Sequence, residues 1–162
     1  MNSLNLFGAK HLHFSFIDTV FRKHNFLYDH RLRKKLAESI DSLQTNPKTL
    51  ILAPLGVGDH PDHLLINKLA QKLKSPVLFW EDFPYNTNHQ SVEMFYNSNP
   101  RLKRAFNLNP TENTSKFGAI RLHKSQMRVL FKNGVIPTLP EKYFYLKDSK
   151  ILTNLFAEFS EP

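Results

Sequence analysis

Residues 49–63 read TLILAPLGVGDHPDH, an apolar run that passes into a glycine-containing loop with two histidines. The run Thr49–Ala53 has no polar alternation, which is typical of a strand covered on both faces, as in a parallel sheet. After the loop, leucines recur at helical spacing between residues 64 and 73, and a second apolar run follows at Val77–Trp80. Strand, loop, helix and strand in this order predict a βαβ unit.

Each predicted strand is followed by a polar motif. Functional loops of parallel sheets lie beyond the carboxyl ends of the strands, so we expect His60–His63 and Glu81–Tyr85 at one edge. The two imidazoles can project toward one point, and a carboxylate such as Asp62 or Asp82 can fix an imidazole tautomer. This set is adequate for metal ligation or acid–base chemistry. The alternative is structural, with acidic side chains bonded to loop amides and aromatic rings packed in the core.

The remaining segments predict further helices, one strand and one long irregular connection. An apolar stripe predicts a helix that begins at Asp29 and ends near Pro47. Residues 86–114 are rich in Asn, Pro, Ser and Thr and predict a long irregular connection with a short helix near 92–96. Apolar spacing then predicts one helix over 117–131 with a stop at Asn133–Gly134, a strand at 141–145 and a helix at 151–159.

Composition restricts the classes of function. The chain has 162 residues, 41% of them hydrophobic, which suits a single domain over 1–162. It has no cysteine, so any metal would be held by His, Asp or Glu. Without a signal peptide or a long apolar stretch, we expect a cytoplasmic protein with no integral membrane segment. The net charge of +8 is scattered, and its densest run, Arg31–Lys35, lies on the polar side of a predicted helix, so we expect no nucleic-acid partner.

Four stretches resemble, in order and approximate spacing, the PIG-L/LmbE-like (GlcNAc-PI de-N-acetylase-like) family of zinc-dependent deacetylases. The loop over 53–63 is similar to the family's second signature, a glycine-containing loop that ends in His-x-Asp-His. Residues 79–85 are similar to its aromatic Glu-Asp-x-Pro-Tyr segment, and 116–126 to its Lys-x-x-Ala-x-x-x-x-x-Ser-Gln helix. Asp18 and Arg22 look like the Asp and Arg upstream of the loop. The resemblance implies an α/β fold, a Rossmann-like three-layer sandwich with a mostly parallel sheet.

The resemblance also implies an activity, which is hydrolysis of the acetamide of an N-acetyl amino sugar or a similar small molecule, with zinc as cofactor. His63 would be a zinc ligand. His60 would polarise or protonate the tetrahedral intermediate, and Asp62 would orient His60. The remaining candidates would bind substrate or support these groups: Asp18, Arg22, Asp82 and Tyr85.

The sequence departs from the family at its first signature, Ala-His-Pro-Asp-Asp, which does not occur. We therefore expect the chain to correspond to the C-terminal two-thirds of the domain, without the N-terminal βα portion, with an incomplete zinc site and no activity alone. An open sheet edge would favour association with the missing segment or with a second copy. The alternative function is a non-catalytic sugar-binding remnant of the same fold.

Overall fold

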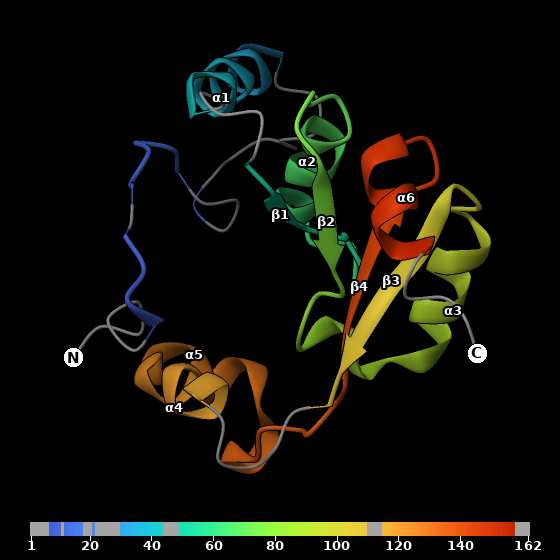
Figure 1. Ribbon diagram of the computed structural model, residues 1–162. Coiled ribbons are helices and arrows are strands. Elements are labelled where there is room, and N and C mark those ends of the chain that lie inside the picture. The colour runs from blue at the N-terminus through green and yellow to red at the C-terminus, as the bar shows by residue number, and fades with distance from the viewer. Residues whose placement is uncertain are drawn as a thin grey trace. The chain divides into compact units, whose positions relative to one another are not determined.

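The computed structural model describes residues 7–10, 12–17, 21, 30–43, 49–109 and 115–157 (Figure 1). The chain divides into two compact units, one formed by residues 1–16 and 108–141 and the other by residues 17–107 and 142–162. Among the described residues, no helix has both the length and the apolar character that crossing a bilayer requires.

A four-stranded sheet in the order β1-β2-β4-β3 organises the larger unit. Its strands are β1 (Ile51–Pro54), β2 (Val77–Trp80), β3 (Leu102–Leu108) and β4 (Glu141–Leu146). Strands β1 and β2 are parallel and are joined through helix α2 (Pro61–Ala70), so the predicted βαβ unit is confirmed.

The sheet is mixed, so the expectation of a mostly parallel sheet is not confirmed. Strand β1 runs parallel to β2, with Ile51 opposite Val77, whereas β4 runs antiparallel to β2, with Phe144 opposite Phe79. An apolar run indicates that a strand is buried on both faces, but burial does not fix the direction of its neighbour.

Both faces of β2 are covered, which explains why its sequence is apolar throughout. Successive side chains of a strand point to opposite faces. Phe79 belongs to a core cluster with residues of α2 and of α3 (His89–Asn97), whereas Leu78 packs with residues of β4 and of α6 (Lys150–Ala157). Helices therefore lie on both faces of this sheet.

Helix α1 (His30–Leu43) confirms the predicted amphipathic helix, although both predicted boundaries, Asp29 and Pro47, lie outside the described residues. The connection over 86–114 is not irregular throughout. It contains the short 3-10 turn η4 (Tyr85–Thr87) at its start, then α3, which confirms the short helix predicted near 92–96 and is longer than predicted, and then β3. Strand β3 has half-buried and exposed side chains, so its sequence lacks the apolar run that revealed β1 and β2.

The smaller unit contains two helices where one was predicted. These are α4 (Ser115–Leu122) and α5 (Lys124–Leu130), followed by the 3-10 turn η5 (Lys132–Gly134). The helix breaks at His123, whose backbone has φ −85° and ψ 60°. The predicted stop is confirmed, because Asn133 and Gly134 both have positive φ values.

Candidate active site

The His60–His63 loop leaves β1 and turns directly into α2. His60 is the residue before the helix and has extended backbone angles, and Pro61 occupies the first turn, where its missing N–H costs no hydrogen bond. The amide of Leu64 donates to the carbonyl of His60 at 3.0 Å. Both histidines and Asp62 are therefore placed at the start of a regular helix.

Asp82 connects the end of β2 to this loop. Its side chain is fully buried, and its Oδ2 accepts hydrogen bonds from the amides of Gly56 (2.6 Å) and Val57 (2.9 Å). Its other oxygen, Oδ1, lies 2.7 Å from Nδ1 of His63, whose side chain is 31% exposed. The expectation that the two polar motifs share one edge of the sheet is thus confirmed. Asp82 also binds loop amides, as the structural alternative predicted.

Three rings lie close together beside this contact. The ring centroids of His60 and His63 are 4.8 Å apart, and that of Tyr85 is 5.8 Å from His60 and 5.6 Å from His63. Gly58 permits this arrangement, because its φ is +85° and a Cβ atom placed there would lie 2.5 Å from Cβ of Tyr85. The packing of Gly58 against Tyr85 could not be seen in the sequence.

The two imidazoles offer different nitrogen atoms to a ligand. Nδ1 of His63 faces the Asp82 carboxylate, so we assign its proton to Nδ1, which leaves Nε2 as a lone-pair donor. Nδ1 of His60 is buried and has no hydrogen-bond partner among the described residues. A buried imidazole nitrogen without a partner is expected where a ligand or water completes the site.

Zinc needs about three protein donors in a catalytic site. The part of the chain that the structure describes contains no cluster of three or more His, Cys, Asp or Glu side chains placed to hold a metal ion. His63 meets the chemical requirement for one donor, because a carboxylate orients its ring. The described residues therefore do not supply a complete set of donors for zinc.

Glu81, the neighbour of Asp82, is the centre of a second polar cluster. Its carboxylate is buried and accepts from Asn86 Nδ2 at 3.1 Å, from the hydroxyl of Tyr96 and from Lys142 Nζ at 3.3 Å. Burial, together with the hydrogen bond and charge of Glu81, raises the pKa of Tyr96 well above its ordinary value. Sequence reasoning missed this cluster, because its partners lie 5, 15 and 61 positions away without a shared motif.

The remaining predicted residues lie outside the described residues, in the smaller unit or at the start of α2. Asp18 and Arg22 lie outside the described residues. Lys116, from the motif over 116–126, belongs to the smaller unit, where its Nζ lies 2.6 Å from Oε1 of Glu141. Asp62 is in the first turn of α2, and its predicted role toward His60 stays a prediction.

No known family model and no curated protein matches the chain. Solved structures that resemble it include the antimicrobial reagent A40926 pseudoaglycone deacetylase Dbv21, with 20% identity, a TM-score of 0.62 and coverage of 89% of this chain and 66% of that one. A deacetylase of the teicoplanin biosynthesis pathway, crystallised as a deacetylase-bog complex, has 19% identity, a TM-score of 0.64 and coverage of 91% and 71%.

The chain spans about two-thirds of the length of these two solved chains. TM-scores of 0.62 and 0.64 over 89% and 91% of the present chain show a common fold. The described part of the chain therefore has the fold found in two deacetylases, with a histidine pair and a buried aspartate gathered at one edge of its sheet.

Proposed function

We propose that the chain provides part of the active site of a deacetylase that hydrolyses the acetamide of an N-acetyl amino sugar or a similar small molecule. The observation that carries this proposal is the contact of 2.7 Å between Asp82 Oδ1 and His63 Nδ1. It orients an imidazole at the carboxyl edge of the sheet, where α/β proteins bind their ligands. The fold shared with two deacetylases supports the same class of reaction.

The proposed roles follow from the positions of the side chains. Hydrolysis adds water to the acetamide carbonyl carbon, breaks the C–N bond and releases acetate and an amine, which takes up a proton. His60 would stabilise the developing oxyanion or deliver that proton, because its ring adjoins His63 and carries a buried nitrogen without a protein partner among the described residues. Tyr85 would form one wall for the sugar, with its ring against both histidines.

Zinc belongs to the proposal as a cofactor toward which His63 presents Nε2. When bound, zinc would acidify a water molecule and polarise the acetamide carbonyl. Asp82 would hold the His63 ring in place, as carboxylates do for metal-ligating histidines. The remaining donors would come from outside the described residues, either elsewhere in this chain or on a second polypeptide.

Zinc titration of the isolated chain, followed by NMR of the histidine side chains, tests the metal part of the proposal. We expect weak binding in which the His63 resonances shift first, and we expect His63→Ala to abolish that response. His89→Ala is the matched control, because His89 is exposed at the start of α3. Stoichiometric zinc that survives dialysis would contradict the incomplete donor set, and a response centred on other histidines would contradict the role of His63.

Acetate release tests the catalytic part. The chain should release no acetate from an N-acetylglucosamine glycoside alone. It should gain activity when a polypeptide with the Ala-His-Pro-Asp-Asp signature is supplied, and His63→Ala or a chelator should remove that activity. A reconstituted complex that hydrolyses the acetamide equally well with His63→Ala would refute the proposal.

A non-catalytic sugar-binding protein is the second candidate, favoured by the ring of Tyr85 packed beside two imidazoles on the loop. Such a protein would keep its affinity for an N-acetylated sugar after treatment with a chelator. The Tyr85→Ala variant would then lose sugar binding without any dependence on metal. Calorimetric titration of the sugar in the presence and absence of chelator separates the two candidates.

A further inference from the structure

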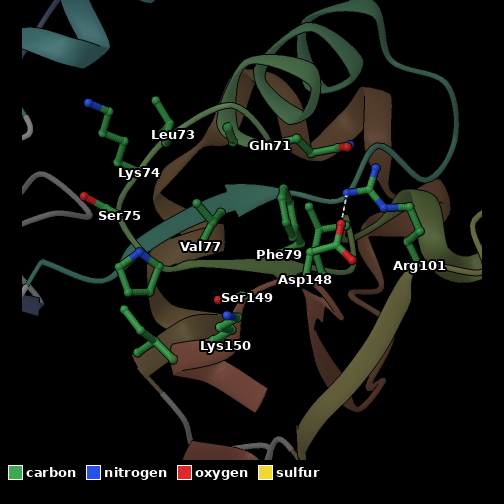
Figure 2. Close-up of a pocket in the computed structure, with 14 residues that line it drawn as sticks. Gln71, Leu73, Lys74, Ser75, Val77, Phe79, Arg101, Asp148, Ser149 and Lys150 are labelled. Atoms are coloured by element: carbon green, nitrogen blue, oxygen red, sulfur yellow. Dashed lines mark hydrogen bonds and ion pairs between the residues drawn. The ribbon is translucent and has the colours of Figure 1, made fainter. Parts of the chain in front are cut away.

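A cavity of about 500 Å³ opens at the amino end of β2 (Figure 2). Val77, the first residue of β2, lines it, whereas the contact between Asp82 and His63 lies beyond the other end of that strand. The cavity shares no residue with the proposed active site, and its volume lies within the roughly 300–1,000 Å³ of small-molecule sites.

The wall of the cavity is apolar in the centre. Val77 and Phe79 of β2 are only 8% and 1% exposed, so they form a floor with little free surface. Leu73 and Ile151 also line the cavity, and their side chains are half-buried and 61% exposed, respectively. Leu146, the last residue of β4, adds a further apolar side chain from the neighbouring strand. A ligand with an apolar portion can therefore be held over the sheet by the burial of hydrocarbon surface.

The rim of the cavity is basic. Arg101 is paired with Asp148, so this cation and this anion largely neutralise one another. Lys74 and Lys150 also line the cavity, and among the described residues no carboxylate lies within ion-pair distance of either ammonium group. In Figure 2, Lys150 lies with Ser149 below Phe79, whereas the side chain of Lys74 points away from Val77 and Phe79 on a flexible stem. The unpaired charge favours an anion over a cation or a neutral molecule.

We propose that this cavity binds an amphiphilic anion. Its carboxylate or phosphate group lies at Lys150 and Ser149, and Lys74 adds positive charge at the rim. Its apolar body lies against Leu73, Leu146 and Ile151. The site is independent of the proposed deacetylase function, because no residue of the His60–His63 loop takes part in it.

Octanoate and octyl phosphate are the probes, and the readout is the backbone amide NMR spectrum of the full 162-residue chain. Both probes should shift the amides of residues 75, 77–79 and 146–151 and leave those of His60, Asp62 and His63 unchanged. Octan-1-ol lacks the charge and inorganic phosphate lacks the apolar body, so each should bind about tenfold more weakly or worse. Equal binding of inorganic phosphate and octyl phosphate would reduce the site to an adventitious ion only and would overturn the proposal.

Charge reversal locates the anionic group. The double variant Lys74→Glu and Lys150→Glu should weaken octanoate binding about tenfold. The matched control, Lys72→Glu and Lys147→Glu, makes the same change in net charge at exposed residues outside the cavity and should stay within about twofold of the wild-type affinity. Equal losses in both double variants, or amide shifts centred on 60–63, would overturn the proposal. The spectra of the wild-type chain with the four probes test the proposal even if a variant does not fold.

Discussion

At the scale of single residues, Asp82 links the two motifs from which the candidate site is built. One of its oxygens binds two loop amides and the other faces His63. The fully buried carboxylate is stabilised by the two amide hydrogen bonds to Oδ2, whereas Oδ1 faces the imidazole of His63 at 2.7 Å. The same side chain therefore fixes the course of the loop and the orientation of the imidazole.

Asp82→Asn should destabilise the fold by about 1.5–3 kcal/mol, the range for hydrogen bonds to a charged group. The amide keeps the shape of the carboxylate but removes the charge that faces His63 Nδ1. Urea unfolding measures the loss, and ¹⁵N spectra of the His63 ring should show a changed tautomer population. Asp148→Asn is the control, because its pair with Arg101 is exposed and is worth only about 0–1 kcal/mol. An unchanged His63 spectrum would show that Asp82 does not set the tautomer.

Gly58→Ala should disturb the candidate site through Tyr85. A methyl group at this position would meet the Tyr85 side chain at 2.5 Å, and the backbone is also in the left-handed region. Gly134→Ala is a matched control, since Gly134 also has positive φ but no atom lies within 4 Å of the added Cβ. We expect Gly58→Ala to cost about 1–3 kcal/mol more than the control, the usual range for overpacking. Equal free energies of unfolding for both variants would rule out the steric role of Gly58.

At the scale of elements, apolar runs predicted two strands, although only β2 is buried along its length and Leu52 of β1 is exposed. The runs before Pro54 and Glu81 are apolar without alternation, so β1, β2 and the βαβ connection could be predicted. Strand β3 could not be predicted, because its side chains are exposed or half-buried and include the charged Lys103 and Arg104. The break between α4 and α5 at His123 could not be predicted either, because the apolar spacing continues through it.

The candidate site also has a part that the sequence predicts and a part that it does not. His60, His63, Asp82 and Tyr85 could be predicted together, because each follows a strand whose carboxyl end is at the same edge of the sheet. The Glu81 cluster could not be predicted, because it joins β2, α3 and β4 through side chains that only the tertiary structure brings together. Local sequence patterns carry no information on such contacts.

Tyr96→Phe should separate α3 from the end of β2 and cost about 1–3 kcal/mol near neutral pH, because buried Glu81 loses a donor. The raised pKa of Tyr96 sets the sign of the pH dependence. Below about pH 10 the phenol is protonated in both states, and above it the unfolded chain loses the proton first, so the contribution to stability falls as pH rises. Urea unfolding should therefore show a difference between wild type and variant that shrinks above about pH 10.

The control for this prediction is a double-mutant cycle with Glu81→Gln. If Tyr96 acts through Glu81, the combined variant should lose less stability than the sum of the single variants. Additive losses, or a difference that grows with alkaline pH, would contradict the proposed hydrogen bond.

At the scale of the whole molecule, the sheet of the larger unit ends at β1. In the described part of the chain β1 pairs with β2 alone. Two apolar side chains at this strand are exposed: Leu50, just before β1, at 47%, and Leu52, within β1, at 55%. An edge strand with exposed apolar side chains presents backbone groups and surface on which another strand can pair.

Leu52→Lys should therefore reduce self-association of the chain without loss of stability. The added charge opposes edge-to-edge pairing, and because Leu52 is already more than half exposed, its replacement leaves no cavity. Sedimentation velocity over a concentration series measures the association, and urea unfolding checks the fold. Met94→Lys places the same charge on an exposed apolar position of α3, 63% exposed and away from any strand, and should leave association unchanged. If both variants weaken association equally, general charge rather than the β1 edge governs it, and a wild-type chain that stays monomeric throughout would remove this edge as a contact between copies.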